Sequence, residues 1–296
     1  MFSIKKRTTL VYGLLSLVVL IWGFNFSFVK WALSKVGPLA FNGVRFTVAT
    51  VLILIVLFFR EGWEPTPVSD LLKMAGLGLV GHSLYQILFI KGLSLTTAGN
   101  SSLLIATSPI WTALLSVGLK KEDVNRKGWA GIVLAFAGVF LVTWGSGSKL
   151  TFGQSKTTGD LLTLAAALSL SAYTVLSKDL LERYSPLRLT ALTMAAGAVG
   201  IWIYGGPSVV AQDWSALSAT AWLVLLYSAV FAVVVGYLVW FTAVQAIGPT
   251  RSAIFNNMTP IISFTVAFIL LGEPVSWLQI AGGVTVLLGI RLTVKS

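Results

Sequence analysis

The sequence predicts an all-α polytopic membrane protein whose ten transmembrane helices form two inverted five-helix repeats. Two observations support this fold class. First, 56% of the 296 residues are hydrophobic and only 10% are charged, whereas a soluble domain carries about 25% charged residues. Second, landmarks in the first half of the chain recur in the second half at a constant spacing. Duplicated membrane bundles are the usual architecture of secondary transporters.

The repeat is defined by a proline inside a hydrophobic run, a glutamate in a short loop and two glycines in the next run. These landmarks are Pro109, Glu122, Gly131 and Gly138 and, 151 residues later, Pro260, Glu273, Gly282 and Gly289. Further upstream the spacing is 148 residues, as Lys30 and Lys178 show. We therefore predict one repeat in residues 1–150 and a second in residues 151–296.

The elements follow from the hydrophobic runs, because each membrane span needs about 20 apolar residues. The runs divide into ten segments: 9–30, 38–59, 70–93, 95–118, 128–145, 158–178, 186–205, 217–246, 251–271 and 275–293. The connections between them are short, so we expect no soluble domain to host separate chemistry.

The net charge of +11 is spread over the ends of the spans, which favours a lipid bilayer over nucleic acid as the partner. With a cytoplasmic N-terminus, 15 of the 21 Lys and Arg residues fall on the cytoplasmic side. This asymmetry predicts that both termini are cytoplasmic. Because each repeat has an odd number of spans, the second repeat is inverted relative to the first.

Several residue types are missing where an enzyme or a pump would need them. The chain has no cysteine and one histidine, and no Asp or Glu lies in the middle of a predicted span; Asp179 comes closest. We therefore expect no metal, no cofactor and no catalysis, although a membrane-embedded enzyme acting on lipid-linked substrates is the alternative from another class. Ion-driven transporters usually keep an intramembrane carboxylate, so we expect a facilitator driven by the substrate gradient.

The third span carries a polar face. His82, Tyr85, Gln86 and Phe89 follow helical spacing, and a polar face at membrane depth must point into the bundle. Two interpretations remain open: the face lines a cavity, or His82 and Gln86 bind a neighbouring helix as packing contacts.

Aromatic and amide side chains in other spans are candidates for the same cavity. They are Trp22, Asn25, Tyr173, Trp240 and Asn256. We expect these residues to meet His82, Tyr85 and Gln86 near mid-membrane and to bind a small-molecule substrate. Neutral amides beside aromatic rings suit an amphipathic or zwitterionic ligand, whereas a strongly charged ion would need a counter-charge.

Pro109 and Pro260 lie inside their predicted spans, where proline removes one backbone hydrogen bond. Such a site is either a static kink or a gating hinge, and its recurrence in both repeats favours a hinge. The fifth and tenth spans carry small residues at four-residue spacing, which allows close helix packing, within the chain or between protomers. We expect a monomer or a weak homodimer.

Residues 22–26 (Trp-Gly-Phe-Asn-Phe), followed by Lys30, Pro38 and Arg45, resemble the opening of an EamA domain. The proline, glutamate and glycine landmarks complete the resemblance in each half, although Thr193 replaces Arg45 in the second. The chain is similar over nearly its whole length to a ten-helix member of the drug/metabolite transporter superfamily.

This resemblance implies export or exchange of small metabolites, with a cavity lined mainly by helices 1, 3, 4, 6, 8 and 9 and with helices 5 and 10 outside it. The aromatic interior is most similar to YddG-type exporters of aromatic and other amino acids. Broad drug or metabolite exporters share the scaffold, and sequence symmetry does not distinguish an exporter from an uptake permease.

Overall fold

A computed structural model describes residues 2–119, 125–145 and 155–294. Regular structure in these three ranges is entirely helical, and the helices group into ten consecutive spans, as the sequence predicts. Six of the described segments have the length and hydropathy to cross a membrane: 9–32, 38–61, 98–118, 155–181, 186–211 and 219–247. The predicted boundary at residues 150 and 151, and the landmark Glu122, lie outside the described residues.

The first repeat consists of five spans, two of which are interrupted. In order they are α1 (Phe2–Ala32), α2 (Pro38–Glu61), α3–η1–α4 (Val68–Gly78, Leu79–Leu84 and Tyr85–Leu95), α5–α6 (Ala98–Ile105 and Ser108–Gly118) and α7 (Arg126–Gly145). The wider η1 turn is π-helical, a local change of helical register that is frequent at functional sites.

The second repeat has the same organisation. Its spans are α8 (Ser155–Leu181), α9 (Pro186–Ala211), α10–η2–α11 (Ala219–Tyr227, Ser228–Val235 and Gly236–Ile247), α12–η3–α13 (Pro249–Phe255, Asn256–Met258 and Thr259–Leu271) and α14 (Trp277–Val294). Its π-helical segment η2 and its break at η3 lie about 151 residues after η1 and after the break between α5 and α6. The two repeats therefore interrupt the same two helices at matching positions.

The structure corrects the expected setting of the paired prolines. Pro109 lies in the first turn of α6 and Pro260 in the first turn of α13, each just after a break, and neither lies within a continuous helix. The first turn of a helix has no intrahelical acceptor for its N–H groups, so proline removes no bond there. At the first break, the Ser108 hydroxyl donates to the Ile105 carbonyl at 2.5 Å.

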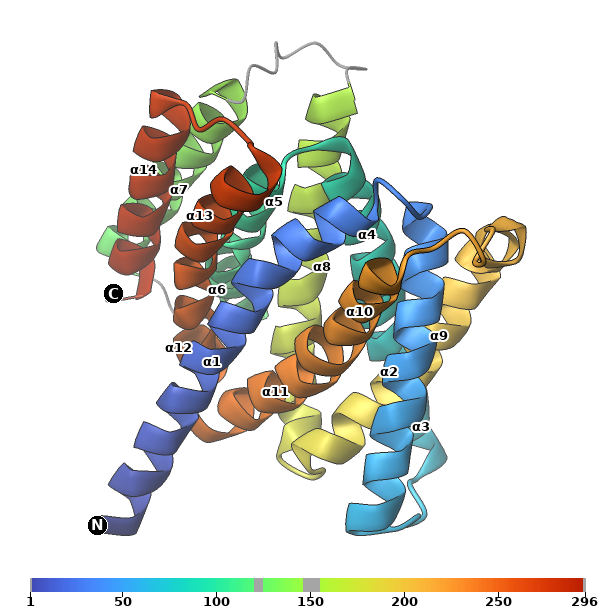
Figure 1. The fold of residues 1–296 in the computed structure, drawn as a ribbon. Helices are drawn as coiled ribbons and strands as arrows, with labels where there is room; N and C mark the ends of the chain where they lie inside the picture. The colour runs from blue at the N-terminus through green and yellow to red at the C-terminus, as the bar shows by residue number, and fades with distance from the viewer. Residues whose placement is uncertain (1, 120–124, 146–154, 295–296) are drawn as a thin grey trace.

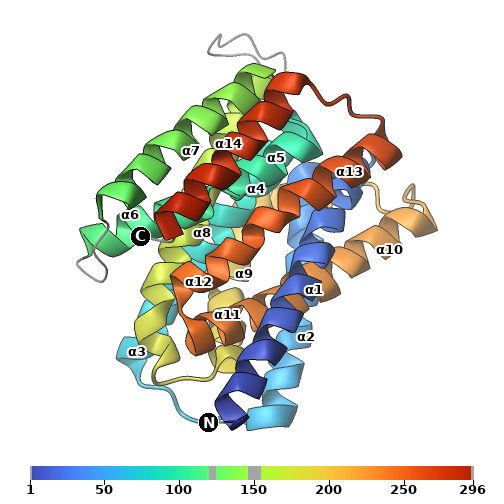
Figure 2. The ribbon, with the colours of Figure 1, turned by 90° about the vertical axis from the view of Figure 1, so that its left-hand side faces the viewer.

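Helices α7 and α14 pack side by side along one edge of the bundle (Figure 2). A β-carbon at Gly138 would lie 2.6 Å from the backbone nitrogen of Val286, and one at Gly289 would lie 2.5 Å from that of Ala135. The small residues of the fifth and tenth spans thus make a close contact within one chain. The other spans enclose the interior, where α2 pairs with α9 and α4 pairs with α8 (Figure 1).

Candidate functional site

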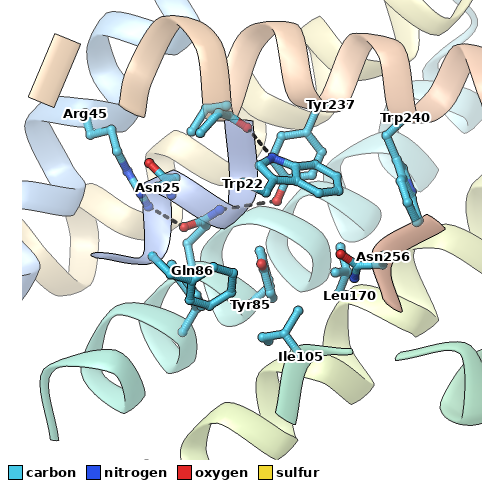
Figure 3. Close-up of a pocket in the computed structure, with 14 residues that line it drawn as sticks. Trp22, Asn25, Arg45, Tyr85, Gln86, Ile105, Leu170, Tyr237, Trp240 and Asn256 are labelled. Carbon is cyan, nitrogen blue, oxygen red and sulfur yellow. Dashed lines mark hydrogen bonds between the residues drawn. The ribbon is translucent and has the colours of Figure 1, made fainter. Parts of the chain in front are cut away.

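A cavity of about 580 Å³, including its open mouth, lies between the two repeats (Figure 3). Its wall consists of Trp22, Asn25, Phe26, Arg45, Tyr85, Gln86, Phe89, Ile105, Leu170, Ala232, Val233, Tyr237, Trp240 and Asn256. These residues come from spans 1, 3, 4, 6, 8 and 9, with Arg45 added from span 2, while α7 and α14 contribute none of them.

Six of the eight predicted binding residues line this cavity, namely Trp22, Asn25, Tyr85, Gln86, Trp240 and Asn256. His82 and Tyr173 do not. Both side chains are buried behind the wall, where His82 Nε2 lies 3.1 Å from the Tyr173 hydroxyl and 3.2 Å from Thr193 Oγ1. His82 therefore joins α8 and α9 as a packing contact, which is the alternative that the sequence left open.

The π-helical turn explains why His82 leaves the face that it shares with Tyr85 and Gln86 in an ideal helix. His82 lies within η1, whereas Tyr85 and Gln86 begin α4. A π-helical turn contains more residues than an α-helical turn, so it rotates His82 away from the two residues that follow. The His82 ring still packs against the ring of Tyr237, with the ring centroids 4.8 Å apart.

Equivalent positions of the two repeats line the same cavity. At the 151-residue spacing, Gln86 corresponds to Tyr237, Phe89 to Trp240 and Ile105 to Asn256, and all six residues line the wall. Trp22 and Leu170, 148 residues apart, form a fourth pair. The Gln86 amide nitrogen lies 3.2 Å from the Tyr237 hydroxyl, so one pair is joined directly. The cavity is thus centred where the two repeats meet.

Trp22 is held by a feature of the η2 segment. The N–H of Gly236 bonds to the carbonyl of Phe231 in the π-helical pattern, which leaves the Ala232 carbonyl to accept the Trp22 indole N–H at 2.9 Å. A β-carbon at position 236 would lie 2.7 Å from the indole nitrogen, so glycine makes room for the ring. The Trp22 and Trp240 rings then pack 5.6 Å apart as one aromatic wall.

Arg45 is the charged residue of the wall, and it was not among the predicted binding residues. It is only 1% exposed, and its guanidinium donates to Asn42 Oδ1, Gln86 Oε1 and Ser228 Oγ. The signal was available: Arg45 is a charged residue inside an otherwise apolar run, and an intramembrane ionisable residue marks a functional site by default.

The described carboxylates lie within two turns of a helix end or in loops. Asp179 was expected to be the acid nearest to a span interior, but the buried acids among the described residues are Asp70, with 2% exposure, and Asp160, with 1% exposure. Asp160 Oδ1 accepts the Thr96 hydroxyl at 2.6 Å, which ties the start of α8 to the connection after α4. Asp160 is not part of the cavity wall.

Comparison with known proteins gives the family. The EamA-like transporter family matches residues 9–144 and 157–295, nearly the whole chain. The chain belongs to the EamA-like transporter family. This family is part of the drug/metabolite transporter superfamily, so the chain is a multi-pass membrane protein that handles a small-molecule metabolite.

Relatives of this EamA transporter are similar over nearly their full length. An uncharacterised transporter of Archaeoglobus fulgidus is 32% identical over 95% of this chain and 96% of its own. A probable amino-acid metabolite efflux pump of Salmonella typhimurium is 28% identical over 94% of this chain and 92% of its own. One solved crystal structure shares the fold, with a TM-score of 0.67 at 16% identity, over 94% of this chain and 97% of that chain.

Proposed function

We propose that this EamA protein is a secondary transporter of the bacterial inner membrane that exports small amphipathic metabolites, chiefly amino acids, including aromatic ones. The observation that carries the proposal is the cavity between the repeats, where aromatic rings alternate with amide and hydroxyl groups. Such a wall suits a ligand with both an apolar and a polar part. The Salmonella typhimurium relative is named a probable amino-acid metabolite efflux pump, a function of the same class.

Alternating access between the inverted repeats is the mechanism that we propose. Inverted repeats allow one half to adopt the conformation of the other while the central site stays in place. Gln86 and Tyr237 are equivalent residues in direct contact, so exchanging the two conformations returns the pair to the same arrangement. The matching breaks before Pro109 and Pro260 lie beside the cavity residues Ile105 and Asn256, and we assign them the role of hinges.

Three further observations support the proposed orientation, assembly and coupling. The 15-to-6 distribution of basic residues supports cytoplasmic termini. The close α7–α14 contact uses its small residues within one chain, which supports a monomer or a weak homodimer. The cavity wall contains no Asp or Glu, which supports transport driven by the substrate gradient alone.

Counterflow in liposomes tests the proposed function. Purified protein is reconstituted into vesicles preloaded with one unlabelled compound, and uptake of the labelled compound is followed for a panel of amino acids, nucleobases and amphipathic drugs. We expect counterflow for amino acids, strongest for those with aromatic side chains. Preference for the drugs would favour a broad exporter, and net uptake by intact cells would favour a permease. If no compound in the panel gives counterflow above protein-free vesicles, the transport proposal is wrong.

A further inference from the structure

We propose that Arg45 anchors a carboxylate subsite, so that the metabolites carried by this protein bear a carboxylate group. This inference rests on the proposed transport function and names its substrate class. It also revises the expectation of a cavity without a counter-charge, because Arg45 places one cation in the wall. The second repeat has Thr193 at the equivalent position, so the charge lies on one side of the pseudo-symmetric cavity only.

The first argument is charge. Arg45 is buried, and the three groups that accept its hydrogen bonds, from Asn42, Gln86 and Ser228, are all neutral. Among the described residues, no Asp or Glu forms an ion pair with it. Arginine stays protonated in proteins, and an isolated buried charge is costly unless an opposite charge joins it. The cavity therefore presents a cation that lacks its counter-ion.

The second argument is the number of free donors. A guanidinium has five N–H donors, of which three are used by the neutral partners at 3.1 Å (Ser228 Oγ) and 2.5 Å (Asn42 Oδ1 and Gln86 Oε1). The Nε atom is buried and has no partner among the described residues. The rings of Phe41 and Phe46 lie 5.5 and 6.0 Å from the guanidinium carbon and help to hold it.

The third argument is the direction of the hydrogen bonds that lead from Arg45 into the cavity (Figure 3). Because a guanidinium only donates, Gln86 must offer its carbonyl oxygen to Arg45 and turn its NH₂ toward the Tyr237 hydroxyl. Tyr237 accepts that bond and keeps its own O–H proton for another acceptor. The chain of three residues thus presents a donor to the cavity, which suits a carboxylate oxygen.

The opposite polarity occurs at Asn25. Its Oδ1 is buried and unpartnered among the described residues, and Asn25 lines the cavity between Arg45 and Trp22 in Figure 3. An amide oxygen accepts a hydrogen bond from an ammonium group, and the Trp22 ring beside it attracts a cation through its face. Carboxylate at Arg45, ammonium at Asn25 and an apolar side chain toward Leu170 and Trp240 together describe an α-amino acid.

The test compares ligands that differ only in their charged groups. L-phenylalanine, L-phenylalaninamide, phenethylamine and 3-phenylpropionate are assayed for binding by the thermal shift of the purified protein, and as competitors in counterflow. We expect L-phenylalanine and 3-phenylpropionate, which carry a carboxylate, to bind at least about tenfold more tightly than L-phenylalaninamide and phenethylamine. The amide and the amine lack the carboxylate that would form a charge-assisted hydrogen bond with Arg45. Equal binding of all four compounds by the wild type would overturn the carboxylate subsite.

Variants locate the preference. In Arg45→Gln, the affinity for L-phenylalanine should fall at least about tenfold, while the affinity for L-phenylalaninamide should stay within about twofold of wild type. Arg45→Lys should recover part of the preference for the acid. The matched control is Lys91→Gln in α4, because Lys91 donates to the exposed Tyr204 hydroxyl and is not in the wall. An unchanged acid-to-amide ratio in a folded Arg45→Gln protein would also overturn the proposal.

The two proposals fail in different ways. If Arg45→Gln does not fold, the four-ligand series on the wild type still decides the subsite. Carboxylate-selective thermal shifts without counterflow would support the subsite and contradict transport. Counterflow that accepts the amide and the amine as readily as the acid would support transport and contradict the subsite.

Discussion

Gln86 and Tyr237 occupy the same position in the two repeats, 151 residues apart, and hydrogen-bond to each other at 3.2 Å in the centre of the molecule. Most residues of the cavity wall have their repeat equivalent in the same wall, but this pair is in direct contact. Arg45 binds the Gln86 side of the pair only. The interface between the repeats therefore combines a contact between equivalent residues with one asymmetric charge.

The first prediction concerns this pair. Tyr237→Phe removes one hydrogen bond and should cost about 1 kcal/mol of stability, whereas Gln86→Leu also takes an acceptor from buried Arg45 and should cost about 1–3 kcal/mol. The double variant should cost less than the sum, with a coupling of about 0.5–1 kcal/mol. Denaturant unfolding of the purified variants measures this, and additive losses would show that the hydrogen bond contributes no stability.

The second prediction concerns the paired prolines. Alanine at position 109 supplies an N–H that could bond to the Ile105 carbonyl once the break closes, so Pro109→Ala should let α5 and α6 join into one helix and slow transport. Pro260→Ala should do the same to α12 and α13. Because the repeats are inverted, the two variants should bias accessibility toward opposite sides, and single cysteines near each mouth, on this cysteine-free background, report that by labelling.

The control for the prolines is Pro207→Ala, because Pro207 lies inside α9, is exposed and is not in the cavity wall. It should leave labelling and transport unchanged. Wild-type transport and labelling in both Pro109→Ala and Pro260→Ala would mean that the prolines only start their helices.

The third prediction is topology. Alkaline phosphatase fused after residue 296 should be inactive, because the basic asymmetry places the C-terminus in the cytoplasm, where this enzyme does not mature. The matched fusion after Asp213, in the connection between α9 and α10, should be active. An active fusion after residue 296 together with an inactive fusion after Asp213 would mean that the topology is inverted, with both termini outside the cytoplasm.

The fourth prediction is coupling. Because the cavity wall contains no carboxylate, initial substrate flux in liposomes should change little when the pH gradient is removed. Asp160→Asn and His82→Ala alter the buried groups best placed to carry a proton. Flux in these variants should also change little when the pH gradient is removed. If the wild-type flux collapses when the pH gradient is removed, and one of the two variants no longer responds to the gradient, the residue changed in that variant is a proton carrier.

The fifth prediction concerns the α7–α14 contact. Gly138→Ala places a methyl group where only 2.6 Å is available to the Val286 backbone nitrogen, so it should destabilise the protein by about 1–3 kcal/mol. Gly76→Ala in α3 is the matched control, because nothing lies within 4 Å of a β-carbon there; it should be neutral or slightly stabilising. The two melting temperatures in detergent decide the matter, and equal values would argue against close packing at Gly138.

The ten spans and the twofold repeat are properties that the sequence determines by itself, because apolar length and landmark spacing are local or periodic features that survive any arrangement of the helices. Six of the eight proposed binding residues were also within reach, since polar groups at membrane depth must face the interior. The hinge and binding roles themselves remain predictions.

The tertiary structure decided which way the remaining side chains face. His82 leaves the cavity because a π-helical turn rotates it toward Tyr173 and Thr193, and a helical wheel drawn on an ideal helix does not contain that turn. Arg45 enters the wall because Asn42, Gln86 and Ser228, from three different spans, supply the acceptors that hold it. Such partners lie as far as 183 residues away in sequence, so the role of a single charged residue is set by the packing of helices that its own segment does not specify.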